Sequence, residues 1–343
     1  MHAKRKSFIA ALALAALTLT VSAAPLPQLN LDKTQTSVSG ASSGGYMAVQ
    51  LHVAYSSSFK KGIGVVAGGP FNCADNSVLN AIGRCLGYAP IPVDELVATT
   101  NKWAREGLID ASSQMESSKV YLFSSPSDTV VKQATTFALQ AFYQNYLPAA
   151  NIVHKQDIAS EHAFVTDNYG AVCLTKAPPF INNCGFDLAG ALLQHLYGPL
   201  TSSKAGALES GLIEFDQTPF ATGHGMGASG WIYVPKTCAA GAQCRLHVAL
   251  HGCKQNSTDV GQEFVRNAGY NRWADSNNMV ILYPQTGKGA VNSCWDWWGY
   301  DSANYAKKSG PQMVAIMAMV EHLSRGTLSL TKLPPADLTP AKR

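Results

Sequence analysis

A serine whose neighbours suit an activated nucleophile lies early in the chain, in the pentapeptide Gly40-Ala41-Ser42-Ser43-Gly44. In the Gly-x-Ser-x-Gly pattern, a strand turns sharply into a helix and presents the serine hydroxyl at the turn. The backbone of such a turn is strained, so its residues must be small, and every other member of the pentapeptide is glycine, alanine or serine. The pattern indicates nucleophilic attack on an ester or amide carbonyl. The alternative is an ordinary Gly/Ser turn.

Such a serine needs a base to accept its proton and an acid to hold that base. In hydrolases with this turn, the acid and then the histidine follow the serine along the chain, each in a loop behind a strand. Asp128 follows a predicted strand over Val120–Phe123, and His162 follows a predicted strand over Ile152–Lys155. The sequence therefore predicts a catalytic triad of Ser42, Asp128 and His162.

Other residues compete for the two supporting roles. His224, in a glycine-rich loop, is the main alternative to His162, and Asp167 is the main alternative to Asp128. Glu161 is too close to His162 in sequence to orient its ring easily. The remaining histidines are expected on helices (His52, His195, His322), in strands (His154, His247), in the leader (His2) or in a loop with another use (His251).

The elements that must position these residues alternate between strand and helix. Predicted strands cover Thr34–Ser39, Gly62–Ala67, Val120–Phe123, Ile152–Lys155, Gly230–Val234, Leu246–Leu250 and Val280–Tyr283. Predicted helices cover Tyr46–Tyr55, Lys132–Tyr146, Val260–Asn277 and Pro311–Leu323. Strands separated by helices predict an α/β fold, with a mostly parallel sheet that helices cover on both faces. We find no repeats and no linker, so a single domain is expected.

The oxyanion of the tetrahedral intermediate needs two backbone N–H donors. One is expected from Ser43, and the other from a His-Gly loop that normally precedes the serine. Here too few residues precede Ser42 for that, whereas His251-Gly252-Cys253 follows the predicted strand Leu246–Leu250. We therefore predict a circularly permuted α/β-hydrolase fold in which the N–H of Cys253 is the second donor.

The first residues have the pattern of an export signal. Residues Met1–Lys6 are positively charged, Phe8–Val21 is an apolar run, and Val21-Ser22-Ala23 supplies the small residues of a cleavage site. The apolar run is short for a membrane span. We predict a signal peptide over residues 1–23 and a catalytic domain over residues 24–343, secreted into the medium or the periplasm.

Charge argues against several classes of partner. Removal of residues 1–23 removes Lys4, Arg5 and Lys6 and no acidic residue, so the net charge falls by three, from +4 to +1. Nucleic-acid binding needs a basic patch, which a near-neutral chain does not favour. A net charge close to zero suits a neutral, apolar or solid substrate. We expect no nucleic-acid partner, no stable membrane association and a monomer.

All eight cysteines follow the predicted cleavage site, and an even number in an exported protein indicates disulfides. Eight cysteines allow about 105 connectivities, but the spacing suggests four local pairs. These pairs are Cys73–Cys85, Cys173–Cys184, Cys238–Cys244 and Cys253–Cys294. Zinc is the alternative use, but the sequence has no Cys-x-x-Cys pair. We therefore expect no metal and no cofactor.

Taken together, these motifs resemble the secreted poly(3-hydroxybutyrate) depolymerases whose catalytic domain is a circularly permuted α/β hydrolase. The matching segments are Ser39–Met47, Ser127-Asp128, His162–Phe164, Leu250–Gln255 and Cys294–Tyr300. They span nearly all of the mature chain, and their rotated order is more specific than any one of them. The resemblance implies the same triad, the oxyanion donors Ser43 and Cys253, and a polyester substrate.

A tryptophan-rich segment follows Cys294. If Cys294 is bridged to Cys253, then Trp295, Trp297 and Trp298 lie beside the oxyanion loop. An aromatic face suits the methyl-bearing backbone of a hydroxybutyrate chain. We therefore predict that these three residues bind substrate, with Trp298 as the first candidate for the cleft and at least one of the three in the core.

The predicted function is that of a secreted serine esterase, which cleaves poly(3-hydroxybutyrate), another polyhydroxyalkanoate or their oligomers through an acyl-enzyme. Many members of the family carry a linker and a separate polymer-binding domain. We expect neither here, which argues against efficient attack on crystalline granules. One alternative is a feruloyl or acetyl-xylan esterase. An alternative from another class is a non-catalytic polymer-binding protein with a vestigial triad.

Overall fold

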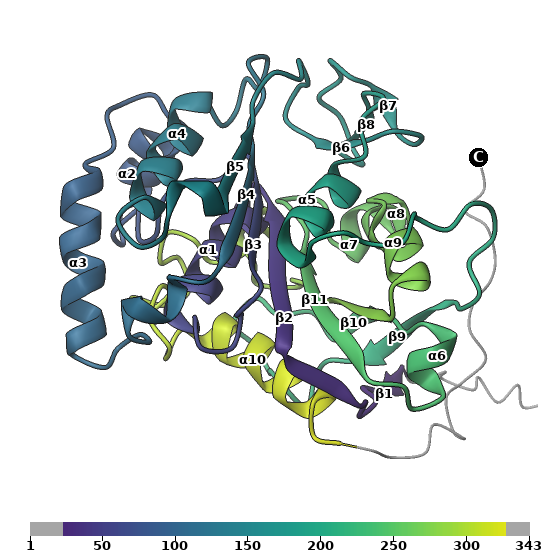
Figure 1. The fold of residues 1–343 in the computed structure, drawn as a ribbon. Helices are drawn as coiled ribbons and strands as arrows, with labels where there is room; N and C mark the ends of the chain where they lie inside the picture. Colours follow the sequence, from purple (N-terminus) through teal and green to yellow (C-terminus); the bar gives the residue numbers. More distant parts are fainter. Residues whose placement is uncertain (1–22, 327–343) are drawn as a thin grey trace, which may run out of the picture.

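The structure is a computed structural model that describes residues 23–326. A central sheet of nine strands runs through these residues (Figure 1). In spatial order the strands are β1 (Ala24–Pro25), β9 (Leu212–Asp216), β10 (Ser229–Tyr233), β12 (Met279–Tyr283), β11 (Cys244–Leu250), β2 (Leu31–Ala41), β3 (Gly62–Val66), β4 (Lys119–Phe123) and β5 (Ile152–Lys155). Neighbouring strands are parallel, except that β10 is antiparallel to both β9 and β12. The predicted mostly parallel α/β sheet is confirmed.

The strand that leads to Ser42 lies between strands from opposite ends of the chain. In Figure 1 the purple β2 is next to the green β11. Both β11 and β3 pair with β2 in parallel, and Leu250 at the end of β11 is opposite Gly40. The loop after β11 and the turn after β2 therefore meet at the same edge of the sheet. This adjacency is the rotated strand order that the sequence predicted.

Helices cover both faces of the sheet. One face carries α1 (Ser43–Ala54), α3 (Val93–Arg105), α4 (Gln133–Tyr143) and α10 (Pro311–Leu323), and the other carries α5 (Leu188–Tyr197), α8 (Glu263–Asn267) and α9 (Tyr270–Ser276). Three short helices are α2 (Val78–Ile82), α6 (Lys236–Ala239) and α7 (Ser257–Val260). Single 3-10 turns cover Arg84–Leu86, Ser112–Met115, Ala149–Asn151 and Val291–Ser293. None of the helices within residues 23–326 is long and apolar enough to span a membrane.

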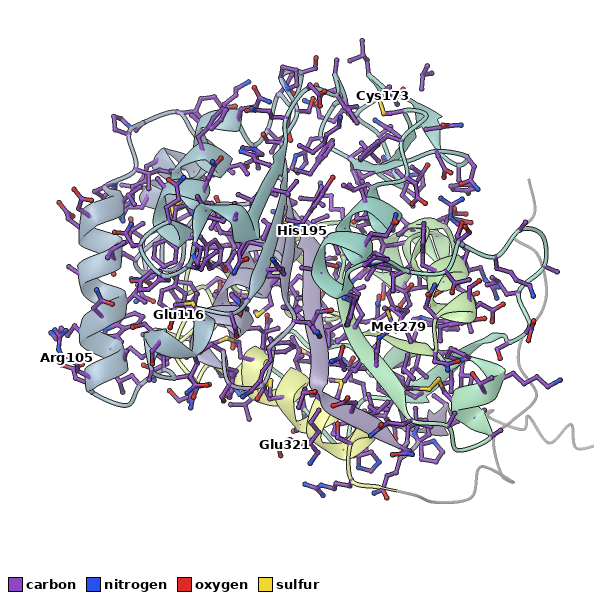
Figure 2. The ribbon with its side chains drawn as sticks, in the orientation of Figure 1. Arg105, Glu116, Cys173, His195, Met279 and Glu321 are labelled. Atoms are coloured by element: carbon purple, nitrogen blue, oxygen red, sulfur yellow. A yellow bond between two sulfur atoms is a disulfide. The ribbon has the colours of Figure 1, made fainter. Side chains whose placement is uncertain are left out.

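The strands β3, β4 and β12 are mainly apolar on both faces because helices cover both faces of the sheet. Side chains alternate along a strand, so Val65 packs into the core beneath α1 while Val66 joins the core beneath α5. Figure 2 shows side chains filling these two layers, whereas Arg105, at the end of α3, is exposed. Met279 of β12 is fully buried. Burial on both faces explains why these strands are apolar runs rather than alternating ones.

One helix that the sequence predicted as continuous is interrupted in the structure. The range Val260–Asn277 contains two short helices, α8 and α9, and begins at the last residue of a third, α7. The chain breaks at Gly261, with φ 61°, and at Gly269, with φ 91°. Glycine adopts these left-handed angles readily, so each glycine changes the direction of the chain although the apolar pattern continues.

A second, smaller sheet was also missed. Its strands are β6 (Phe164–Thr166), β8 (Ile181–Asn183) and β7 (Ala171–Val172), in that spatial order and all parallel. Each strand is too short to show a periodicity in sequence. This sheet begins immediately after His162, so it supports the loop that carries the predicted base. The predicted signal peptide lies outside the described residues except for Ala23.

The eight cysteines form the four predicted disulfides, and no free cysteine remains in the described chain. The pairs are Cys73–Cys85, Cys173–Cys184, Cys238–Cys244 and Cys253–Cys294. Three of them close short loops and restrain the unfolded chain locally. The fourth joins the loop after β11 to the tryptophan-rich segment, as the sequence suggested.

Several histidines are buried as neutral rings, which makes the stability depend on pH. Burial lowers the pKa of His52 and His247 to about 3 and that of His251 to about 4. An imidazole in the unfolded chain titrates near pH ~6.5, so below that pH the unfolded chain binds protons that the folded protein does not. We expect the free energy of unfolding to hold above about pH 6.5 and to decrease between about pH 6.5 and 4.

Urea unfolding followed by circular dichroism at several pH values measures this dependence. His247 is the best position for a control substitution. Ser37 and Ser39 each place a hydroxyl 2.7 Å from one of its ring nitrogens, so the neutral ring has a partner on both sides. Replacing His247 by Gln removes a buried titrating group and should flatten the curve. An unfolding midpoint that stays constant down to about pH 4 would contradict the expectation.

Candidate active site

Ser42 lies in a strained turn between β2 and α1. Its backbone has φ 54° and ψ −120°, a region in which a side chain costs about 1–3 kcal/mol. The N–H of Ser42 donates to the carbonyl of Val66 at 2.8 Å, and its carbonyl accepts the N–H of Tyr46 at 3.0 Å. The end of β3 and the first turn of α1 thus hold the turn from two sides. This is the strand–turn–helix geometry of a nucleophile elbow.

Two glycines are required by close approach of the backbone. A Cβ on Gly40 would lie 2.1 Å from the carbonyl oxygen of Gly44. A Cβ on Gly44 would lie 2.3 Å from the carbonyl oxygen of His251, at the end of β11. The first glycine lets the helix start directly above the strand, and the second lets the elbow pack against the neighbouring loop. The spacing of the motif therefore follows from sterics.

Ser42, His162 and Asp128 form one hydrogen-bonded chain. The hydroxyl oxygen of Ser42 lies 2.9 Å from Nε2 of His162, and Nδ1 of His162 lies 2.8 Å from Oδ2 of Asp128. The other carboxylate oxygen of Asp128 accepts the N–H groups of Val130 and Val131 at 2.8 and 2.9 Å. These two bonds fix the orientation of the carboxylate. The connectivity lets His162 accept the serine proton while Asp128 holds the opposite side of the ring.

The alternatives weighed from the sequence lie apart from this chain. His224 is half exposed and pairs with a different carboxylate, that of Asp301, at 2.8 Å. Asp167 is engaged in an ion pair with Arg272 at 2.6 Å. The carboxylate of Glu161 contacts the backbone of the next residue and not an imidazole ring. Asp128 and His162 are the pair that the structure brings to Ser42.

The two predicted oxyanion donors lie beside Ser42. Ser43 is the first residue of α1, where backbone N–H groups have no partner within the helix and carry the positive end of its dipole. A Cβ on Gly252 would lie 3.4 Å from Cβ of Ser42, and Cys253 follows Gly252 directly. Ser42 and Cys253 also line the same cavity. The arrangement can offer two N–H groups to an oxyanion on a carbonyl attacked by Ser42.

A buried histidine orients the backbone of the predicted second donor, Cys253. Nε2 of His251 accepts the N–H of Thr286 at 3.2 Å, so its proton is on Nδ1, which donates to the carbonyl of Gly252 at 2.7 Å. In a planar trans peptide the N–H points opposite to the C=O. Holding the Gly252 carbonyl therefore turns the N–H of Cys253 away from His251. Burial lowers the pKa of His251 to about 4, which keeps the ring in the neutral form that this arrangement requires.

Trp295 requires a correction. Its side chain is completely buried, and its Nε1–H donates to the carbonyl of His251 at 3.0 Å. It supports the oxyanion loop from within the core, so the prediction that Trp295 contacts substrate is wrong. Trp297 is 9% exposed and stacks on Tyr46 at 4.5 Å between ring centroids. Trp298 is only partly buried. Neither ring lines the cavity at Ser42, so their contact with substrate stays a prediction.

A cavity of about 320 Å³ adjoins the Ser42 hydroxyl. Its lining residues are Ala41, Ser42, Val66, Ala67, Val130, His162, Ala163, Phe164, Phe180, Gly252, Cys253, Lys254 and Gln255. Apart from the polar groups already described, its walls are mainly apolar. Gln255 fixes one wall, because its Oε1 accepts the N–H of Gly252 at 2.8 Å and its Nε2 donates to the carbonyl of Phe180 at 3.0 Å. Sequence reasoning missed Phe180 and Val130, which lie outside every predicted element.

No metal chemistry is indicated by the side chains present. Within residues 23–326 we find no cluster of three or more His, Cys, Asp or Glu side chains that could hold a metal ion. A larger hollow of about 600 Å³ lies beside β1, lined by residues such as Pro25, Phe220 and His322. It contains no serine or cysteine beside its histidine. The Ser42 cavity, in contrast, is lined by both Ser42 and His162.

Comparison with known proteins gives consistent matches. The family profile described as "Esterase PHB depolymerase" matches residues 229–326, which include the oxyanion loop. The poly(3-hydroxybutyrate) depolymerase of Delftia acidovorans is 59% identical over 333 residues, covering 96% of this chain and 67% of that protein. The polyhydroxybutyrate depolymerase of Talaromyces funiculosus is 39% identical over 325 residues, covering 89% of this chain and 94% of that protein.

Solved structures agree with the sequence matches. The crystal structure of PHB depolymerase from Penicillium funiculosum superposes with a TM-score of 0.83 at 37% sequence identity, covering 88% of this chain and 98% of that chain. A PHB depolymerase variant complexed with an R3HB trimer gives the same values.

Proposed function

Because the chain belongs to the polyhydroxybutyrate depolymerase family, we propose that it hydrolyses the ester bonds of poly(3-hydroxybutyrate) at the Ser42 cavity. The chain is a carboxylic ester hydrolase. One observation supports the assignment of Ser42 most directly, namely the hydrogen-bonded chain from Ser42 through His162 to Asp128. A strained elbow and an apolar cavity at the same serine agree with it.

In the acylation step, Oγ of Ser42 attacks the ester carbonyl while Nε2 of His162 accepts the hydroxyl proton. The carbonyl oxygen becomes an oxyanion facing the N–H groups of Ser43 and Cys253. When the intermediate collapses, the ester C–O bond breaks and His162 returns the proton to the leaving hydroxyl. The acyl group stays on Ser42, and an alcohol-terminated fragment leaves.

In the deacylation step, a water molecule gives its proton to His162 and attacks the acyl carbon. The second tetrahedral intermediate uses the same two backbone donors. Its collapse breaks the bond to Oγ of Ser42, which takes the proton back from His162. The product is a hydroxyacid or a shorter oligomer, and the serine is free again.

The cavity suits a chain of short, methyl-bearing ester units. Phe164, Phe180, Val66 and Val130 supply apolar walls, and only a few polar groups near Ser42 are available to bind a carbonyl. A solved relative is complexed with an R3HB trimer, which supports an oligomer or polymer of 3-hydroxybutyrate as the substrate here. No observation favours a feruloyl or acetyl-xylan ester, or binding without catalysis.

We also propose that the protein acts outside the cytoplasm, in the medium or the periplasm. Four disulfides are characteristic of exported proteins, and residues 1–23 have the composition of a signal peptide. Secretion agrees with a substrate that is too large to enter a cell.

Clearing of a turbid suspension of amorphous poly(3-hydroxybutyrate) tests the substrate. The purified protein should clear the suspension and release hydroxyacid, detected by chromatography, whereas it should release little ferulate from methyl ferulate. Cleavage of a soluble 3-hydroxybutyrate trimer, measured in parallel, separates chemistry from access to the solid. Rapid ferulate release with both the suspension and the trimer intact would overturn the assignment in favour of the feruloyl esterase alternative.

A further inference from the structure

We propose that Glu161 is a positioning residue, which holds His162 against Asp128 by joining the two loops that carry them. The proposal deepens the proposed function, because it rests on Ser42, His162 and Asp128 as the reacting groups. Glu161 has no place in the triad itself.

The carboxylate of Glu161 binds both loops at once. Its Oε2 accepts the backbone N–H of His162 at 2.7 Å. Its Oε1 accepts the hydroxyl of Thr129 at 2.6 Å, and the N–H of Thr129 lies 3.3 Å from Oε2. Thr129 follows Asp128 directly. A single side chain is thus bonded to the backbone of the predicted base and to the residue next to the predicted acid.

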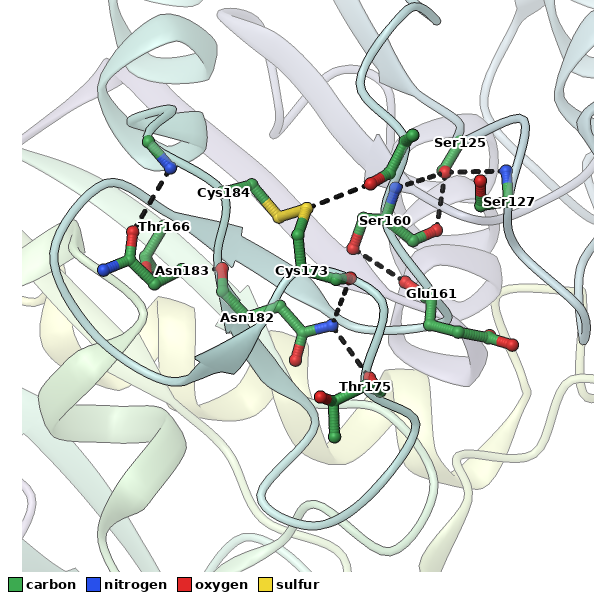
Figure 3. Close-up of a disulfide and its surroundings, with 12 residues drawn as sticks. Ser125, Ser127, Ser160, Glu161, Thr166, Cys173, Thr175, Asn182, Asn183 and Cys184 are labelled. Atoms are coloured by element: carbon green, nitrogen blue, oxygen red, sulfur yellow. Dashed lines mark hydrogen bonds between the residues drawn. A yellow bond between two sulfur atoms is a disulfide. The ribbon is translucent and has the colours of Figure 1, made fainter.

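A neutral link joins the same loops one step further back (Figure 3). The hydroxyl of Ser125 donates to the carbonyl of Ser160 at 2.6 Å and accepts the N–H of Ser160 at 2.8 Å. It also accepts the N–H of Ser127 at 3.0 Å. This link holds the two loops together, but it ends two residues before His162. The Glu161 carboxylate is the side chain that reaches the backbone of His162 itself.

The main chain of Glu161 is also held, by the carbonyl of Cys173, which Figure 3 shows accepting a bond from Asn182 as well. The N–H of Glu161 donates to the carbonyl of Cys173 at 2.9 Å, and Asn182 donates to the same carbonyl at 2.8 Å. The Cys173–Cys184 disulfide closes this segment. The backbone of Glu161 is therefore anchored to a cross-linked loop, and its side chain can hold the backbone of His162 at a fixed position.

Charge adds to this geometry. Burial acts to raise the pKa of Glu161, but the hydrogen bonds from Thr129 and from the N–H of His162, together with the charge of Lys176, outweigh it and lower the pKa. Only 13% of the side chain is exposed. Lys176 lies 3.9 Å from Oε1 and donates to the Thr129 hydroxyl at 2.6 Å. The carboxylate is therefore anionic at neutral pH.

An anion at this position favours the imidazolium that His162 forms during catalysis. The other charged groups near His162 are Asp128, which binds Nδ1, and Lys132, whose Nζ lies 3.4 Å from the carbonyl of Asp128. Lys176 faces Glu161 from the disulfide-closed loop. Glu161→Gln removes an anion that is bonded to the backbone of His162 and leaves Lys176 without this counter-ion, so the imidazolium formed during catalysis is less stabilised.

Glu161→Gln is the decisive variant. It keeps the length of the side chain but turns one acceptor into an N–H₂ donor that faces the N–H donors of His162 or Thr129. We expect kcat on a soluble p-nitrophenyl ester to fall about ten- to a hundredfold, since a misplacement of about 1 Å at a reacting group can cost roughly 10²-fold. KM should change less than about twofold. The acid limb of the kcat/KM profile should move to lower pH.

A second pair of variants keeps the test informative if Glu161→Gln folds poorly. Thr129→Val removes the hydroxyl bonded to Oε1, and Thr129→Ser retains it, so the first should reduce kcat and the second should restore it. Thr129→Val combined with Glu161→Gln should cost less than the product of the two separate losses, because both remove the same contact. Glu214→Gln, at an exposed position of β9, is the matched control and should match the wild type.

The possible outcomes distinguish the role of Glu161 from the proposed ester hydrolysis. An unshifted pH profile in Glu161→Gln, with kcat equal to that of Glu214→Gln, would overturn the role of Glu161 while leaving the esterase assignment intact. A loss of kcat accompanied by a lower unfolding temperature, with no change in the pH profile, would also overturn it. A wild-type protein without ester turnover would instead refute the proposed function.

Discussion

Ser42→Ala is expected to abolish ester turnover while leaving the fold unchanged. Alanine is smaller than serine and keeps the backbone bonds of Ser42 to Val66 and Tyr46, so the elbow should form. The substitution removes the only atom that can form the acyl-enzyme. Loss of a triad serine lowers kcat by about 10⁶-fold, and the small remaining activity comes from the oxyanion donors and substrate binding. Initial rates on a p-nitrophenyl ester and on a 3-hydroxybutyrate trimer measure the effect.

A phosphonylating serine reagent provides an independent test of the same prediction. The wild-type protein should carry the label on Ser42, identified by peptide mass spectrometry, and lose activity in proportion to labelling. Ser113→Ala, at an exposed serine far from the elbow in sequence, should label and turn over like the wild type. A label on a different serine, or turnover by Ser42→Ala, would show that the nucleophile lies elsewhere.

Asp128→Asn should lower kcat by about 10⁴-fold, because it reverses the direction of the hydrogen bond to His162. The N–H groups of Val130 and Val131 bind Oδ1 of Asp128, so the amide oxygen of asparagine should occupy that position. The amide NH₂ then faces Nδ1 of His162 and donates to it. The ring proton moves to Nε2, and Nε2 can no longer accept the proton of Ser42.

Asp301→Asn is the matched control for this substitution. It makes the same chemical change at a second His–Asp contact, between His224 and Asp301, which does not include Ser42. We expect its kcat to stay within about twofold of the wild type, whereas the folded fraction of both variants should match that of the wild type by circular dichroism. Equal losses in the two variants would contradict the assignment of Asp128.

Local sterics and chain order explain why Ser42 could be proposed as the nucleophile from the sequence. The elbow needs small residues at fixed positions, and the contacts that exclude a Cβ at Gly40 and Gly44 arise within the turn or against the adjacent strand end. The positions of the acid and the base could be predicted as well, because parallel strands place their carboxyl ends at one edge of the sheet. Asp128 and His162 could therefore be proposed from the strands that precede them.

Contacts between distant segments account for what the sequence missed. Trp295 has the composition of a substrate-binding aromatic residue, but its environment is set by a hydrogen bond to the carbonyl of His251 within the core. Phe180 and Val130 form cavity walls only after their loops fold against Ser42. The helix predicted over Val260–Asn277 shows the same limit, since an apolar period continues unchanged across a glycine that turns the chain.

The sequence by itself predicted Ser42 as the nucleophile, the order of acid and base and the permuted α/β class, and it suggested the four cysteine pairs, because each follows from spacing, chain order or a local steric requirement. Tertiary structure decided how these groups are held. It alone showed that His251 turns the N–H of Cys253, that Trp295 supports the oxyanion loop, and that Glu161 joins the loops of His162 and Asp128. Each of these contacts depends on hydrogen bonds whose partners and directions are set by the folded chain, and spacing along a chain does not specify them.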